Sequence, residues 1–147
     1  MARIEVADVV RHPRDRVFRA AADPQQQLKW DPHTLKSVEK LTSGPLGRGS
    51  RYRGTFKGFG TVDYEFAEFD EPNRFAHLAN VRVGRMRHTF TFDDVPEGTR
   101  VTQVGELQPN LMGRLMGPVF ARKIARRFRL IAQELDAHLA STRNAPQ

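Results

Sequence analysis

Two histidines stand on apolar faces of predicted strands, and they are the first candidates for chemistry. Residues two apart in a strand share one face of the sheet. The apolar residues that alternate with His77 and His88 are Phe75, Ala79, Val81, Met86, Phe90 and Phe92. The apolar face of each strand should point inward, so both imidazoles are predicted to lie inside the protein. An inward imidazole can hydrogen-bond a ligand or move a proton.

Three more polar side chains join this inward set. Gln103 alternates with Val101, Gly105 and Leu107 in the last predicted strand. Tyr52 lies between Arg51 and Arg53, whose charges should face solvent, so its ring is predicted to point inward. Tyr64 is ambiguous, because it shares a face with Phe66 while Ala67 and Phe69 fall on the other. A β-bulge in the segment 61–69 would reconcile the two pairs.

This inward polar set has three interpretations. The groups can fix a carbonyl or hydroxyl of a ligand inside an apolar cavity. They can instead be core residues that hydrogen-bond one another or buried water. His77 or His88 can also serve in proton transfer, which makes these two the weak catalytic candidates of the chain.

Other kinds of site are not indicated by the sequence. The chain has no cysteine, and its five histidines are scattered without the spacing of metal ligands, so no metal site is expected. The segment GPLGRGSRYRG is rich in glycine but lacks the Gly-Lys-Ser/Thr ending of a phosphate-binding loop. No Gly-x-Ser-x-Gly motif is present. We therefore expect no cofactor.

The elements that position these residues follow a simple order. A strand is predicted at 3–10, a helix begins after Pro13, and a second short helix begins at Pro24 and ends near Trp30. Six strands then follow at 38–41, 50–56, 61–69, 74–83, 86–92 and 99–107, joined by short turns. Asn110 is expected to cap a short helix that ends at Met116. The pattern indicates an antiparallel meander.

The last predicted element is a long one-sided helix that begins at Pro118. Its apolar stripe consists of Met116, Phe120, Ile124, Phe128, Ile131, Leu135 and Leu139, at steps of four or three. Its other face carries Arg122, Arg126 and Arg129, which we expect to be solvated. Arg127 lies about 60° from the centre of the stripe, close enough to reach a pocket mouth, although we expect it to extend to water.

These elements predict an α+β domain in which a curved antiparallel sheet of about seven strands wraps around the C-terminal helix. Residues 1–141 should form this single domain, and residues 142–147 a flexible tail. Phe120, Ile124 and Phe128 would form one wall of any cavity between sheet and helix. Leu111, Met112, Leu115 and Met116 could form a mobile lid over it.

The bulk composition limits the classes of partner that the chain is expected to bind. The net charge is +7, but the excess comes from nineteen arginines against five lysines, and acids alternate with bases along most of the chain. We therefore expect no nucleic-acid partner. No apolar run is long enough for a membrane span, and the N-terminus lacks the pattern of a secretory signal. These features predict a cytoplasmic protein without stable membrane insertion. The oligomeric state cannot be inferred from the sequence.

Five segments in series resemble a known family. They are HPRDRVFRAAADPQQQLKWDP, GPLGRGSRYRG, EFDEPNRFAH, TFTFDDVPEGTRVT and GRLMGPVFARKIARRFRLIAQELDAHL, and they cover nearly the whole chain. Their order is similar to the helix-grip fold of the START-like (SRPBCC) superfamily, which includes Bet v 1-like proteins. Within it, the chain most resembles the polyketide cyclase/dehydrase-like proteins of bacteria. The resemblance implies a deep cavity for an apolar ligand and no single activity.

The predicted function is binding of a small or medium hydrophobic molecule of polyketide, aromatic, lipid or isoprenoid type. The first alternative is a polyketide cyclase or aromatase, in which His77 or His88 moves a proton during enolisation and aldol cyclisation. The second is an interaction module that uses the basic face of the helix. The predicted ligand-binding residues are Trp30, Tyr52, Tyr64, Phe75, His77, His88, Phe90, Gln103, Met116, Phe120, Ile124 and Phe128.

Overall fold

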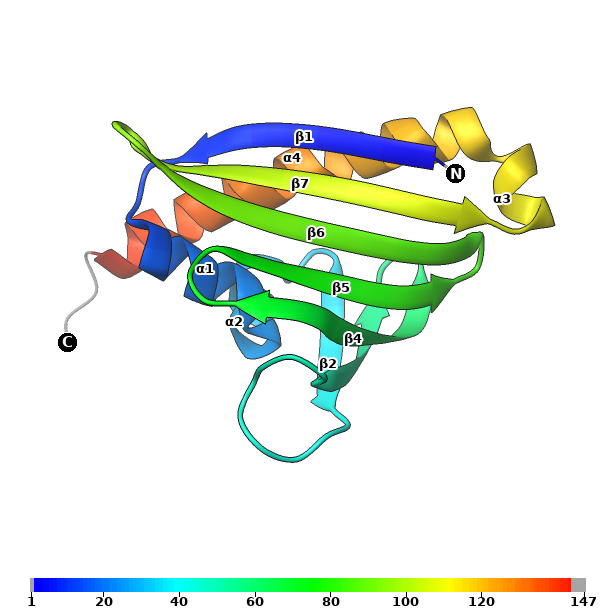
Figure 1. Cartoon of the computed structure of the whole chain (residues 1–147), viewed down its shortest axis with the longest axis horizontal. Coiled ribbons are helices and arrows are strands. Elements are labelled where there is room, and N and C mark those ends of the chain that lie inside the picture. The colour runs from blue at the N-terminus through cyan, green and yellow to red at the C-terminus, as the bar shows by residue number, and fades with distance from the viewer. Residues whose placement is uncertain (1, 144–147) are drawn as a thin grey trace.

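A seven-stranded antiparallel sheet forms one layer of the molecule (Figure 1). The computed structural model describes residues 2–143. The strands are β1 (Ala2–Val10), β2 (Leu35–Lys40), β3 (Arg51–Phe56), β4 (Gly60–Asp70), β5 (Arg74–Val81), β6 (Gly84–Val95) and β7 (Gly98–Pro109). Their order in the sheet is β1-β7-β6-β5-β4-β3-β2. The predicted meander is therefore confirmed, with β1 added along β7.

The helices form the second layer. They are α1 (Arg14–Ala22), α2 (Pro24–Trp30), α3 (Leu111–Leu115) and α4 (Gly117–Arg143). Figure 1 shows α4 running along the sheet behind β1 and β7, with α1 and α2 at one end and α3 at the other. The side chain of Asn110 accepts a hydrogen bond from the Gly113 amide at 2.9 Å and so caps α3. The predicted helix-grip architecture is confirmed.

The apolar stripe of α4 faces the sheet. Ile124, Phe128, Ile131, Leu135 and Leu139 are all buried, whereas Arg122, Arg126 and Arg129 are exposed. Arg129 also donates to Asp8 Oδ1 of β1 at 3.1 Å, so this arginine of the basic face is ion-paired. Burial of one such stripe is the main stabilising contribution of an amphipathic helix.

Phenylalanine rings join α1 to the sheet. Phe18 of α1 meets Phe69, Phe75 and Phe92 edge to face, with ring centroids 5.2–5.6 Å apart. Phe69 reaches this cluster because a register shift between Phe66 and Glu68 places an extra residue in β4. Phe66 and Phe69 therefore both point inward, opposite His77 and Phe75. The expected bulge is present, and it resolves the ambiguous face of the strand.

A missing side chain lets α4 approach the sheet closely. Gly105 of β7 pairs with His88 of β6 on the inner face of the sheet. A Cβ at Gly105 would lie 2.9 Å from Cζ of Phe128, closer than real carbon contacts allow. The glycine thus leaves the space in which the Phe128 ring stacks on His88, with centroids 4.2 Å apart and planes 12° apart.

Helix α4 continues through Arg143, two residues into the segment expected as a tail. Residues 144–147, the remainder of that predicted tail, lie outside the described residues. Among the helices that the structure describes, none has the length and apolar character needed to cross a membrane.

Candidate functional site

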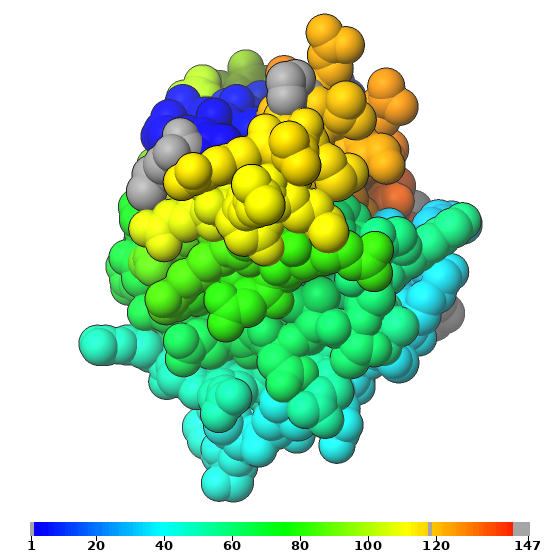
Figure 2. Space-filling view, turned by 90° about the vertical axis from the view of Figure 1, so that its right-hand side faces the viewer, coloured from blue at the N-terminus to red at the C-terminus, as the bar shows by residue number. Residues whose placement is uncertain are grey.

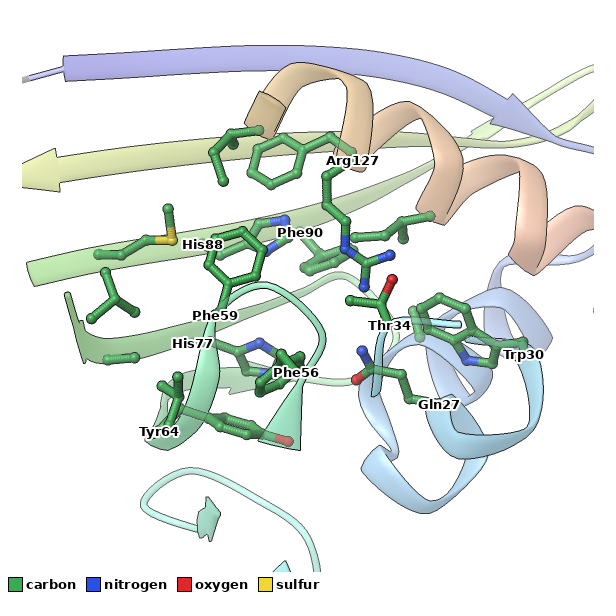
Figure 3. A pocket seen from close by; sticks show the side chains of 18 residues that line it. Gln27, Trp30, Thr34, Phe56, Phe59, Tyr64, His77, His88, Phe90 and Arg127 are labelled. Atoms are coloured by element: carbon green, nitrogen blue, oxygen red, sulfur yellow. The ribbon is translucent and has the colours of Figure 1, made fainter. Parts of the chain in front are cut away.

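A cavity of about 150 Å³ lies between the sheet, α4, α2 and the turn that joins β3 to β4 (Figure 3). Strands β4, β5 and β6 supply one wall and α4 the opposite one. The residues that line it are Ala21, Gln27, Trp30, Thr34, Phe56, Phe59, Val62, Tyr64, His77, Ala79, Val81, Met86, His88, Phe90, Ile124, Arg127, Phe128 and Ile131. The lining is mainly apolar and aromatic, with a few polar groups, as is usual for small-molecule sites.

Seven of the twelve predicted ligand-binding residues line this cavity: Trp30, Tyr64, His77, His88, Phe90, Ile124 and Phe128. Trp30 is held in place by its indole nitrogen, which donates to the Ala20 carbonyl at 2.8 Å. His77 and His88 stand directly opposite each other on β5 and β6. The residues that strand alternation and helix periodicity predicted to face inward at the centre of the sheet and on α4 therefore lie around one cavity.

The other five lie elsewhere. Tyr52, Phe75 and Gln103 point inward but are packed in the core, and they do not line the cavity. Phe75 is covered by Phe18 and by Phe90, whose ring stacks on it at 4.6 Å. Met116 is exposed and Phe120 is half-buried, and both line a separate groove outside the cavity. The alternation rule identifies the inner face, but it does not say where along that face the packing is left open.

Sequence reasoning missed the residues that close the cavity at its edges. Phe56 and Phe59 flank the β3–β4 turn, where the alternation that identified the other residues ends. The turn is held against the start of β2, because the Lys57 amide donates to the Thr34 carbonyl at 2.8 Å. Gln27 gave no signal, since it sits in a run of three glutamines that reads as exposed helix.

The predicted lid is not placed over the cavity. Leu111, Met112, Leu115 and Met116 are all exposed, and none of them lines it. Met112 and Met116 instead line the separate groove outside the cavity, which is also lined by Phe59 and Arg127.

A hydrogen-bond chain fixes the tautomer of His88. Gln103 Nε2 donates to the Phe128 carbonyl of α4 at 2.7 Å, which turns Gln103 Oε1 toward His88. His88 Nε2 lies 3.1 Å from that oxygen and must carry the proton that it donates. The neutral ring then keeps Nδ1 as an acceptor. The ring itself lies between Phe90 and Phe128, with centroid distances of 4.3 and 4.2 Å.

Desolvation keeps both imidazoles neutral, although both side chains are half-buried because they line the partly open cavity. Desolvation lowers the pKa of His77 to about 4, and desolvation together with the nearby His77 lowers the pKa of His88 to about 3. A general acid or base works best when its pKa lies near the working pH. Neutral rings with such low pKa values are weak bases at pH 7. This environment favours a hydrogen-bonding role over the proton transfer of the cyclase hypothesis.

Two other polar groups beside the cavity have no hydrogen-bond partner. Tyr64 Oη and His77 Nε2 are both buried, and no donor or acceptor among residues 2–143 is within reach of either atom. Burial is the main cause that raises the pKa of Tyr64, so its hydroxyl stays protonated. Buried polar groups are rarely left unpaired in proteins, because each such group loses its hydrogen bonds to water.

An ion pair closes one end of the cavity. Arg127 of α4 reaches the end where Thr34 and Gln27 lie (Figure 3), instead of extending to water as expected. Its Nη1 donates to Asp31 Oδ1 at 3.1 Å, and its Nη2 donates to Asp31 Oδ2. The Asp31 side chain is 0% exposed and that of Arg127 17%. Asp31 also accepts from Gln27 Nε2 at 3.2 Å, so the pair connects α2 to α4.

A third charged group adjoins this pair. Desolvation, followed by a hydrogen bond to Asp31, raises the pKa of Glu134 to about 7. Glu134 Oε2 is buried without a donor within reach among the described residues, so the protonated acid itself supplies the donor. When Glu134 is protonated, it adds no charge to the Asp31–Arg127 pair.

Residues 1–140 match the protein family described as "Polyketide cyclase / dehydrase and lipid transport". This match spans nearly the whole chain. The chain belongs to this family. The resemblance drawn from the five segments is thus confirmed at the level of the family.

Solved structures agree with this polyketide cyclase/dehydrase assignment in their fold. A START superfamily protein from Mycobacterium smegmatis superposes with a TM-score of 0.80 at 14% identity, covering 95% of this chain and 98% of that one. Ara h 8.0201 gives 0.74 at 13% identity, with 95% and 98% covered. DynU16, a protein of the dynemicin biosynthetic locus, gives 0.73 at 18% identity, and the match covers 95% of this chain and 48% of DynU16.

No curated protein matches the sequence significantly. The family name and the fold support a hydrophobic ligand-binding role, and they leave the ligand open. In the described part of the chain, no three His, Asp or Glu side chains are grouped as metal ligands would be.

The half-buried and desolvated His77 of this family member should make the free energy of unfolding depend on pH. The pKa of His77 is lower in the folded protein than in the unfolded chain, so protons favour unfolding between pH 6.5 and about 4. As the pH falls through this window, the free energy of unfolding of the unmodified protein decreases. We expect His77→Phe to make that decrease smaller by about 1 kcal/mol per pH unit. Urea unfolding of both proteins from pH 5 to 7.5 measures the difference between their two slopes. The carboxylates that both proteins share contribute equally to each slope and cancel in this difference. Equal slopes for the two proteins would contradict a lowered pKa of His77 in the folded state.

Proposed function

We propose that the protein binds a small apolar molecule, of one or two rings in size, in the cavity between the sheet and α4. The observation that carries this proposal is an apolar, partly open cavity of about 150 Å³ between the inner face of the sheet and α4, lined largely by residues of the hydrophobic core. Protein interiors are packed like organic crystals, and voids of this size are uncommon. Because the cavity is partly open, an apolar ligand that enters it removes the apolar lining from contact with water.

The volume of the cavity limits the size of the ligand. A void of about 150 Å³ is known to hold a benzene-sized molecule in a protein core. A single aromatic ring, a bicyclic aromatic or a small isoprenoid unit suits this space, and so does the end of a longer polyketide or lipid. The neutral acceptor at His88 and the unpaired Tyr64 hydroxyl would pair with a ligand hydroxyl or carbonyl.

A substitution that fills the cavity tests this proposal. Ala79 lines the cavity wall on β5, so Ala79→Phe should occupy the space of the ligand and weaken binding at least 10-fold. The probes are toluene, indole and 2-naphthol, with binding followed by NMR shifts of the cavity methyl groups and by calorimetry. The control is Ala7→Phe, the same change at an exposed position of β1, which should leave the affinities unchanged. Absence of binding by every probe to the unmodified protein would refute the proposal.

A further inference from the structure

A second, larger depression adjoins the cavity. This outer groove has a volume of about 470 Å³ and lies between the β3–β4 turn, the β5–β6 turn, α3 and the outer side of α4. It opens near the end of the molecule seen in Figure 2, where α3, in yellow, lies next to the β5–β6 turn, in green, and the start of α4, in orange. Thr34, Phe59, Val81 and Arg127 line both the groove and the inner cavity. One layer of side chains therefore separates the two spaces.

The charges of the outer groove all have one sign. Lys57, Arg82, Lys123 and Arg126 line it together with Arg127, and no aspartate or glutamate does. Within residues 2–143, the first four make no ion pair with an acid. Arg127 is different, because both of its terminal nitrogens are engaged by Asp31. The unpaired positive charges thus lie in the outer groove. The layer of side chains between groove and cavity carries no unpaired charge, because Arg127 is paired with Asp31.

The remaining walls of the groove are apolar. Met116, Val119 and Leu130 line it and are 47%, 62% and 43% exposed. An apolar trough edged by unpaired cations matches a molecule that joins a hydrocarbon part to an anion.

We propose that the outer groove holds the anionic end of the ligand whose apolar end occupies the inner cavity. The ligand is then an amphiphile with a ring or short hydrocarbon at one end and a carboxylate or phosphate at the other. Access runs past Phe59, whose turn contains Gly58 and Gly60 in left-handed conformations, with φ of 85° and 79°. Lys123 and Arg126 of α4 hold the anion, while the Asp31–Arg127 pair keeps net charge away from the cavity. This inference rests on the proposed function, since it extends the same site.

A matched series of probes tests the inference. The compounds are 6-phenylhexanol, 6-phenylhexanoate and 6-phenylhexyl phosphate, which share one apolar body and differ only at the end group. We expect the two anions to bind about 10-fold more tightly than the alcohol at low ionic strength, with the advantage falling as salt increases. Replacing Lys123→Gln and Arg126→Gln together should remove the advantage and leave the affinity for the alcohol unchanged. The two anions compared with each other show whether a carboxylate or a phosphate suits the groove.

The control variant carries the same loss of charge outside the groove. Arg85→Gln with Arg122→Gln changes two exposed arginines that do not line it, and the preference for the anions should persist. Equal affinities for the alcohol and both anions in the unmodified protein would overturn the inference while leaving the proposed function intact. So would vesicle binding that needs Lys123 and Arg126 without such discrimination, which would indicate membrane docking. Failure of all three probes to bind would overturn the proposed function as well.

Discussion

Replacing Asp31 with alanine is expected to lower the free energy of unfolding by about 3–5 kcal/mol. The substitution leaves the guanidinium of Arg127 largely buried without its counter-ion, since the Arg127 side chain is only 17% exposed. Removing one partner of a buried pair is costly because the remaining charge has lost its hydration, and ionisation of Glu134, whose pKa is raised by desolvation and by Asp31, should recover only part of this loss. Urea unfolding at pH 7 measures the loss.

A double-mutant cycle separates this effect from general damage. Arg127→Met in the Asp31→Ala background removes the stranded charge, so the double variant should be more stable than the sum of the single losses predicts, by at least about 1.5 kcal/mol. The matched control is Asp63→Ala, which breaks an ion pair of similar two-bond geometry with Arg53 on the surface. Both side chains of that pair are nearly half exposed and screened by solvent, so its loss should cost much less than the loss of the Asp31–Arg127 pair. Similar losses from Asp31→Ala and Asp63→Ala would show that the inner pair is not effectively buried.

Truncating Phe128 to alanine should cost about 3–5 kcal/mol, the usual loss for a buried phenylalanine. Phe128 is 2% exposed, contacts His88 across the cavity wall and fills the space left by Gly105. The same change enlarges the cavity, so larger aromatic probes should bind relatively better than toluene. Chemical denaturation and calorimetry measure the two effects.

Gly105→Ala provides the complementary test. In the unmodified protein the added methyl would lie 2.9 Å from Cζ of Phe128, and overpacking of this kind costs about 1–3 kcal/mol. In the Phe128→Ala background the same methyl enters vacated space, so the change should become neutral or stabilising. A loss of equal size in both backgrounds would mean that Gly105 is needed for its backbone and not for the ring of Phe128.

Local patterns were enough to predict the strands, the helices and the inner face of the sheet. His77, His88 and Phe90 could be placed on the inner face of the sheet, and Ile124 and Phe128 on the helix face opposite it, because period-two and period-3.6 alternation are properties of neighbouring residues. Even the bulge of β4 was visible, as a conflict between two pairs of apolar residues.

The features that sequence reasoning missed depend on contacts between distant segments. Arg127 was expected in solvent, because nothing near it in the sequence indicates that Asp31, at the end of α2, lies beside it. Gln103 was correctly predicted to be inward, yet its amide is committed to the Phe128 carbonyl and not to a cavity. Alternation cannot distinguish a polar group that faces a void from one that satisfies a helix carbonyl. That distinction requires the three-dimensional packing.

The pairing of β1 with β7 bears on the order in which the parts of this molecule are expected to fold. In the described structure β1 pairs with β7 at the opposite end of the chain, whereas β2 to β7 pair with their neighbours in sequence. Hairpins between neighbouring strands form quickly, while contacts between chain ends must first overcome the entropy of closing a long loop. β1 also anchors α4, through Asp8 to Arg129 and through the Arg11 amide to Asp136 at 2.8 Å. We therefore expect the local β2–β7 hairpins to form before β1 and α4 dock on them, so that the cavity closes late in folding.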